Sequence, residues 1–243
     1  MTRLSTEREM TKKLALVFIL SLGFSFAASA DMPTETIVHV ENAYAPAGFD
    51  SNDNTEIIIE GYLPNVCHKS PITVSRVNGN EIDISVKALK YSTSNPFCPQ
   101  MIVPFLKPVS IGVLKEGQYN IVVNRGTQYE THSQIEIAPA AKETVDDFLY
   151  AHVEFIQTIP GTNKVALHGY QPSNCLKFDE VLFISNKVDT YSILPKMKQV
   201  SQICTFKRTP FYAEWVVPSE IQREKILLHV RKMDGQSFNM IYY

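Results

Sequence analysis

Cysteine and histidine are the residues of this chain whose chemistry could build a reactive or metal-binding site. Four cysteines are present: Cys67, Cys98, Cys175 and Cys204. Six histidines are present: His39, His68, His132, His152, His168 and His229. A structural zinc site takes ligand pairs two to four residues apart, and no two of these cysteines are that close. We therefore predict neither a metal site nor a cofactor, and we assign the cysteines to disulfides.

The cysteines occupy equivalent places in an internal repeat. Residues 61–67, GYLPNVC, return 108 positions later as residues 169–175, GYQPSNC. The second cysteine of each copy is followed, after five residues, by a Pro-Phe dipeptide. Four cysteines allow three pairings, and the repeat favours bonds within each copy, each worth roughly 3 kcal/mol by loop entropy. The predicted disulfides are Cys67–Cys98 and Cys175–Cys204.

A hydrolytic site is the catalytic alternative, and the sequence gives it little support. No Gly-x-Ser-x-Gly turn is present to carry a nucleophile. His132 and Ser133 are neighbours, but adjacent residues of a strand point to opposite faces. Cys67 beside His68 cannot attack a substrate once its sulfur is oxidised. We predict that the protein is not an enzyme and has no catalytic residues; a site assembled from distant residues around His132 or His168 remains the less favoured hypothesis.

One acidic loop has part of the spacing of a calcium site. Asp50, Asn52 and Asn54 stand at alternate positions. Thr55 then occupies the place of the glycine that a calcium loop requires, and Gly61 the place of its bidentate glutamate. A plain turn between two strands is therefore the favoured interpretation.

The amino-terminal segment has the layout of a secretory signal peptide. Basic residues precede the apolar run at 14–20, and small residues occupy 28–30. We predict a signal peptide at residues 1–30, translated from Met1 or Met10, and a periplasmic or secreted protein with no transmembrane segment after cleavage. The chain has a formal net charge of −2, and cleavage removes more basic than acidic residues, so nucleic acid is not an expected partner.

The pattern of apolar residues predicts an all-β protein. Residues 81–88 alternate strictly between apolar and polar side chains, and Asn78-Gly79 before them is a hairpin-turn signal. Further strands are expected at 37–41, 55–60, 72–77, 118–124 and 134–137, and after Cys98. This number and spacing predict two tandem immunoglobulin-like antiparallel β-sandwich domains. The predicted domains are residues 31–139 and residues 140–243, joined near Ala138–Glu143.

A rigid, disulfide-bonded scaffold without catalytic residues suggests a binding protein. We expect an exported, noncatalytic protein that binds an unknown protein or cell-envelope component through loops or sheet edges, either envelope-associated or resembling a protease inhibitor. Lys196, Lys198, Lys207 and Arg208 could form a basic patch. The closing strand at 237–243 could offer a sheet edge.

A periplasmic carrier or assembly chaperone is the alternative function. Pilus chaperones resemble this chain in layout, because they combine a signal peptide with two immunoglobulin-like domains in a chain of similar length. The basic anchoring residues of that family cannot be placed in this sequence, and a disulfide-bonded tandem duplication is not their pattern. The sequence leaves open the identity of the partner, the oligomeric state and the angle between the two domains.

Overall fold

A computed structural model describes residues 32–91, 98–142, 148–221 and 223–243. The predicted signal peptide, residues 1–30, and Glu143 at the end of the predicted joint lie outside the described residues. Within the described part, no helix has the length and apolar character that a membrane span needs.

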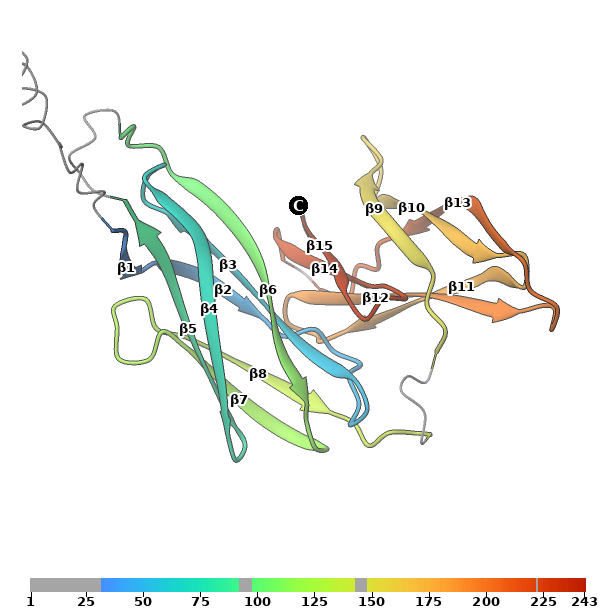
Figure 1. The fold of residues 1–243 in the computed structure, drawn as a ribbon, viewed down its shortest axis with the longest axis horizontal. Coiled ribbons are helices and arrows are strands. Elements are labelled where there is room, and N and C mark those ends of the chain that lie inside the picture. The colour runs from blue at the N-terminus through green and yellow to red at the C-terminus, as the bar shows by residue number, and fades with distance from the viewer. Residues whose placement is uncertain (1–31, 92–97, 143–147, 222) are drawn as a thin grey trace, which may run out of the picture. The chain divides into compact units, whose positions relative to one another are not determined.

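Eight strands form the first repeat as two sheets (Figure 1). The strands are β1 (Thr34–Ile37), β2 (His39–Tyr44), β3 (Asn54–Leu63), β4 (His68–Asn78), β5 (Glu81–Lys90), β6 (Val103–Val113), β7 (Gly117–Val123) and β8 (Thr131–Ile137). One sheet has the order β2-β3-β6, and the other joins β4, β5, β7 and β8, with β1 also paired to β5. The opening strand predicted at 37–41 is thus divided between the two sheets.

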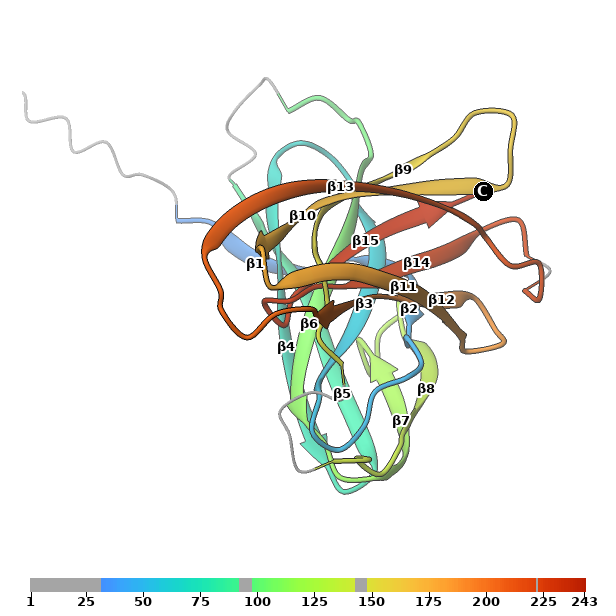
Figure 2. The ribbon, with the colours of Figure 1, turned by 90° about the vertical axis from the view of Figure 1, so that its right-hand side faces the viewer.

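Seven strands form the second repeat, again as two sheets (Figure 2). The strands are β9 (His152–Thr158), β10 (Lys164–Ser173), β11 (Leu176–Ser185), β12 (Thr190–Gln199), β13 (Phe206–Val216), β14 (Ile226–Arg231) and β15 (Ser237–Tyr242). Their orders are β9-β10-β13 and β11-β12-β14-β15. These correspond to β2-β3-β6 and β4-β5-β7-β8 of the first repeat, so the internal repeat in the sequence is also a structural repeat.

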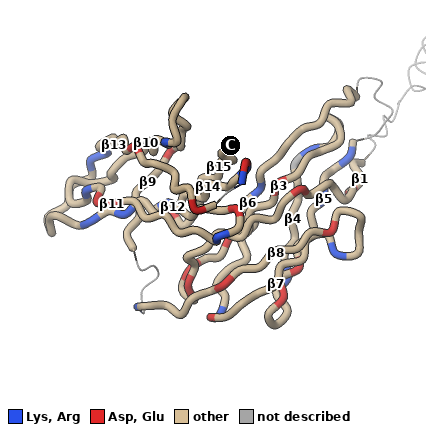
Figure 3. The backbone as a smooth tube through the Cα atoms, turned by 180° about the vertical axis from the view of Figure 1, so that it is seen from behind, with Lys and Arg blue, Asp and Glu red and all other residues tan. Residues whose placement is uncertain are grey.

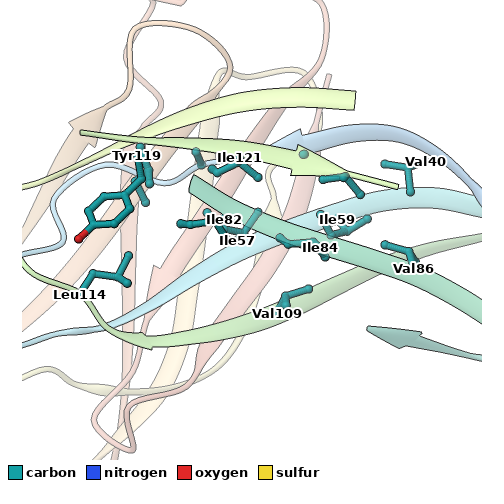
Figure 4. Packing of buried hydrophobic residues seen from close by; sticks show 14 of the residues in the cluster. Val40, Ile57, Ile59, Ile82, Ile84, Val86, Val109, Leu114, Tyr119 and Ile121 are labelled. Carbon is teal, nitrogen blue, oxygen red and sulfur yellow. The ribbon is translucent and has the colours of Figure 1, made fainter. Parts of the chain in front are cut away.

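Alternating side chains of both sheets fill the first core (Figure 4). Ile82 and Ile84 of β5 point inward, as the alternation predicts, and meet Ile57 and Ile59 of β3, all almost fully buried. Each such side chain contributes about 1.5–3 kcal/mol of transfer free energy. The predicted all-β sandwich class is confirmed.

The second core has its own residues and is more aromatic at its margin. Val165, Leu167 and Ile193 are fully buried, while Phe178 and Trp215 are partly exposed. The predicted boundary at residues 139 and 140 falls between β8 and β9. The two sets of strands also contact each other, and residues 33–243 form one compact unit. Independent folding of the two domains stays a prediction.

One pair of strands in each repeat is parallel, a detail that the prediction of antiparallel sandwiches does not include. β5 pairs with β7 in parallel, and β12 pairs with β14 in parallel. The connection between β5 and β7 passes through β6 in the opposite sheet, and such a crossover returns the chain in its original direction. Alternation reveals which residues face the core but not the direction of the neighbouring strand.

The first hairpin turn is built on the predicted glycine, and the second one differs from it. Gly79 has a φ of 58° in the tight turn between β4 and β5. In the second repeat Lys187 adopts a φ of 63°. The Asn186 side-chain oxygen accepts hydrogen bonds of 2.9 Å from three backbone N–H groups of the turn, at Val188, Asp189 and Thr190. Side-chain capping thus holds a lysine in the left-handed conformation that glycine adopts freely.

Candidate binding surfaces

Both disulfides join cysteines of the same repeat, in the pairing that the sequence predicts. The Cα atoms of Cys67 and Cys98 are 5.8 Å apart, and those of Cys175 and Cys204 are 5.1 Å apart. Backbone hydrogen bonds reinforce each bond at equivalent places: Tyr91 N–H donates to the Cys67 carbonyl and Val200 N–H to the Cys175 carbonyl. Each disulfide therefore fixes the loop that precedes β6 or β13 against the start of β4 or β11.

The glycine of the repeated motif is explained by backbone packing. Gly61 and Gly169 lie inside β3 and β10. Gly169 is opposite Phe211 of the Pro-Phe dipeptide, and a Cβ atom there would lie 2.8 Å from that ring and overlap the His152 carbonyl oxygen. Gly61 has the same relation to Phe105 and to His39. The glycine of the motif therefore has a structural role.

We expect Gly169→Ala to lower the free energy of unfolding by about 3 kcal/mol, the upper end for over-packing, because a backbone carbonyl cannot rotate away as a side chain can. Urea titration of the purified protein measures the change. Gly126→Ala is the control: its Cβ would meet open space, and only the positive φ is strained, which costs about 1–2 kcal/mol. Equal losses in the two variants would contradict this explanation of the motif.

The histidines are used in packing and local hydrogen bonds. His39 stacks on Tyr62 and His152 lies over Tyr170, with ring centroids 4.2 and 4.3 Å apart, so this pair is itself repeated. His229 is fully buried and bonds the Asn239 side chain at 2.8 Å. Burial lowers the pKa of His229 to about 4, so it is neutral at physiological pH.

The two histidines of the hydrolase hypothesis lie in separate places. His132 pairs with Glu130 at 2.9 Å on the surface of β8. His168 of β10 stacks on Phe155 and meets Tyr212 edge-on. Neither contact is the nucleophile–base pair that a hydrolase needs. Among the described residues, no group of three or more histidine, cysteine, aspartate or glutamate side chains could hold a metal ion.

The acidic loop is a turn whose side chains bond the protein itself. Asp50 accepts a hydrogen bond of 2.8 Å from Asn52 N–H, and Asn54 accepts one of 2.9 Å from Ser110. Asp53 bonds Asp50 N–H at 3.0 Å and also binds Arg231 of the second repeat. The loop oxygens are thus directed to different partners instead of converging on one point.

Arg231 and Asp53 form a buried ion pair between the two repeats. Their nitrogen and oxygen atoms are 2.9 Å apart, and their side chains are only 8% and 9% exposed. Arg231 also donates to the Gly48 carbonyl at 2.6 Å and stacks over the Phe49 ring at 4.0 Å. Burial raises the pKa of Asp53, and the attraction of Arg231 opposes this only in part. Both residues line a cavity of about 440 Å³.

The outer face of sheet β2-β3-β6 is covered by β14 and β15. The apolar residues of this contact are Tyr44, Ile58, Leu106, Leu227 and Ile241. Glu60 accepts from the Tyr44 hydroxyl at 2.9 Å and pairs with Lys225 at 2.7 Å. Burial and the bond to Glu60 raise the pKa of Tyr44. The closing strand β15 therefore packs on both repeats.

The predicted basic patch is largely neutralised. Lys196, Lys198 and Arg208 pair with carboxylates at 2.6, 2.6 and 3.0 Å. Basic and acidic positions occur in both groups of strands (Figure 3). These bridges are exposed and contribute at most about 1 kcal/mol each, but they cancel the positive field that an anionic partner would need.

Among the residues that the structure describes, the most exposed apolar side chains near a disulfide lie in equivalent loops of the two repeats. In the second repeat Ile203 and Phe206 are 82% and 86% exposed, one on each side of Cys204. In the first repeat Met101 and Ile102, just after Cys98, are 60% and 64% exposed. We name these two segments, residues 98–102 and 200–206, the disulfide loops; the second ends on the first residue of β13. The sequence contained this signal as apolar residues beside the second cysteine of each pair.

Residues 57–133 match the family model of the ORF11 beta-sandwich domain. The matched segment begins within β3, ends within β8 and contains the first disulfide. It agrees with the sandwich architecture of the first repeat. No curated protein and no solved structure matches the chain.

Proposed function

We propose that this protein is an exported, noncatalytic binding protein whose disulfide loops contact a macromolecular partner. The observation that carries the proposal is the exposure of four large apolar side chains in two equivalent, covalently fixed loops: Met101, Ile102, Ile203 and Phe206. Disulfides persist in oxidising compartments, which supports export to the periplasm or the cell exterior. The partner is a protein or a cell-envelope component.

The loops are preorganised, which favours binding. An exposed apolar side chain gains roughly 25 cal/mol for each Å² that a partner removes from water. A mobile loop would lose much of this gain to ordering, whereas each of these loops is held by a disulfide, and the second loop is also held by backbone hydrogen bonds. Thr205 N–H, for example, bonds the Asn174 side chain at 2.8 Å, so the loop around Cys204 is fixed on both sides.

The test compares loop variants with a surface control. Ile203→Asp/Phe206→Asp and Met101→Asp/Ile102→Asp place charges in the loops without touching a core residue. Val188→Asp/Tyr243→Asp changes two exposed apolar residues, 51% and 84% exposed, elsewhere on the surface. Each variant is cross-linked in cells that produce it, and its partners are quantified by mass spectrometry.

We expect the wild type and the control to recover the same partner. In the loop variants the yield of this partner should fall at least about tenfold, which corresponds to a loss of about 1.4 kcal/mol of binding free energy. Unchanged melting temperatures would show that the variants are folded. Recovery of the same partner in equal yield by all variants would disprove binding through the loops. Turnover of a substrate by the purified protein would disprove the noncatalytic function.

A further inference from the structure

The cavity beside the buried ion pair has the size of a site for a small molecule. Its volume of about 440 Å³ falls within the range of about 300–1,000 Å³ that is usual for ligand pockets. Glu56 and Val113 of the first repeat line it together with Tyr150, Arg231 and Met233 of the second. Junctions between domains are common places for such pockets. The disulfide loops do not contribute to its lining.

The described lining of the cavity has one carboxylate that no cation neutralises. Asp53 pairs with Arg231 at 2.9 Å, and Asp234 pairs with Lys232 at 3.5 Å. Glu56 also lines the cavity, and no described lysine, arginine or histidine lies within ion-pair distance of it. Burial raises the pKa of Glu56, and the bond from Ser237 and the charges of Arg231 and Lys232 oppose this only in part. A further cation at this carboxylate would therefore be stabilised.

A chain of hydrogen bonds holds one oxygen of Glu56 and leaves the other available. The Ser237 hydroxyl donates to Glu56 Oε2 at 2.5 Å, and Asn239 Nδ2 donates to Ser237 at 2.7 Å. His229 Nδ1 donates to Asn239 Oδ1 at 2.8 Å, so every donor in the chain points toward Glu56. Such aligned bonds polarise one another and favour the ionised carboxylate. Glu56 Oε1 accepts no hydrogen bond from the described residues and is not sealed from solvent.

The two ends of this chain of bonds have no counterpart in the other repeat. The offset of the repeated motif makes Glu56 equivalent to Lys164. The registers of β7 and β14 on their parallel partners make His229 equivalent to Val122. Both repeats fold as sandwiches, so the fold itself does not require these two side chains. The ion pair of Arg231 between the repeats does not include Glu56 either.

We propose that the cavity binds a primary ammonium group, with Glu56 as its anionic partner. An ammonium is a compact cation with three donors, so it can bond Glu56 Oε1 and also a neutral oxygen of the lining, such as that of the Gln236 side chain. The apolar part of the ligand then lies against Val113 and Met233. Calcium suits the site less well, because it takes about six to eight oxygen ligands and the other two carboxylates are held by cations.

A free alkylamine and a lysine side chain of another protein both present this group. NMR titration of the isotope-labelled protein with pentylamine and with Nα-acetyl-lysine methylamide distinguishes the two sources. We expect shifts of the amide signals of residues 231–237 and a dissociation constant on the order of 1 mM. Pentanol and the norleucine derivative, which lack the charge, should bind at least about tenfold more weakly. Shifts with pentylamine alone would assign the site to a free amine, and shifts with the lysine derivative to a protein side chain.

Two variants test the role of Glu56. Glu56→Gln keeps an oxygen for the Ser237 bond but turns an N–H group toward the ammonium, so binding should weaken at least about tenfold. It should not lower the melting temperature, because burial already disfavours the charged form. Glu35→Gln, which removes an exposed carboxylate outside the cavity, should bind like the wild type.

Three outcomes would overturn the proposal: no shift with either amine, equal affinity for the amines and their neutral analogues, or undiminished binding by Glu56→Gln. The result is independent of the proposed function, because the disulfide loops are unchanged in these variants and do not line the cavity. Failure of either proposal would therefore leave the other standing.

Discussion

Replacing Arg231 with methionine is expected to lower the free energy of unfolding by about 3–5 kcal/mol, the cost of leaving one charge of a buried ion pair without its partner. Methionine keeps the apolar contact with Phe49 but removes the bonds to Asp53 and to the Gly48 carbonyl. Urea denaturation at neutral pH measures the loss. Because these contacts join the two repeats, the variant should also become more susceptible to proteolysis between β8 and β9.

A surface arginine provides the matched control. Arg125 pairs with Glu81 at 2.7 Å and with Asp83 at 2.6 Å, but its side chain is half exposed. Arg125→Met should therefore cost no more than about 1 kcal/mol, although it removes two ion pairs. A similar loss of stability for Arg125→Met and Arg231→Met would show that burial does not make the ion pair of Arg231 more important for stability than an exposed one.

The deficit of Arg231→Met should shrink as the pH falls. Burial already raises the pKa of Asp53, and loss of Arg231 raises it further. A carboxyl group whose pKa is higher in the folded than in the unfolded state binds more protons when folded, so protonation stabilises the fold. The deficit is full at pH values above the raised pKa of Asp53 in the folded state. It is smallest at pH values below the pKa of Asp53 in the unfolded state. A double variant with Asp53→Asn should lose less than Arg231→Met alone at neutral pH.

Removal of either disulfide is expected to lower the free energy of unfolding by about 3–4 kcal/mol, from the entropy of a closed loop of about thirty residues. Cys175→Ala/Cys204→Ala and Cys67→Ala/Cys98→Ala are the variants, and alanine avoids placing a hydroxyl at the buried Cys175. Denaturation without reductant measures each loss. Reductant should destabilise the wild type by at least as much as either variant.

The same variants connect stability with the proposed function. Without its disulfide, a loop must be ordered when its partner binds, so affinity should fall even at temperatures where the variant is fully folded. Each disulfide should affect mainly its own loop. Full affinity in a folded variant that lacks both bonds would show that the loops need no covalent support.

The sequence alone determined the strands, the repeat and the cysteine pairing, because these depend on local patterns. Alternation at residues 81–88 identified the buried positions of β5, and the repeated motif restricted the disulfides to partners within each copy. Period-two patterning is a local consequence of strand geometry and needs no knowledge of the neighbouring strand. Equal cysteine spacing in two copies likewise requires no tertiary structure to interpret.

Only the tertiary structure decided how strands and charges are partnered. It made β5 and β7 parallel and paired Asp53 with Arg231 across 178 positions of sequence. It also covered the outer face of sheet β2-β3-β6 with β14 and β15, and left the equivalent face of sheet β9-β10-β13 exposed. These relations join residues that are far apart in the chain, and no local pattern encodes which distant surfaces meet. Exposure of the disulfide loops is a property of the assembled sheets, for the same reason.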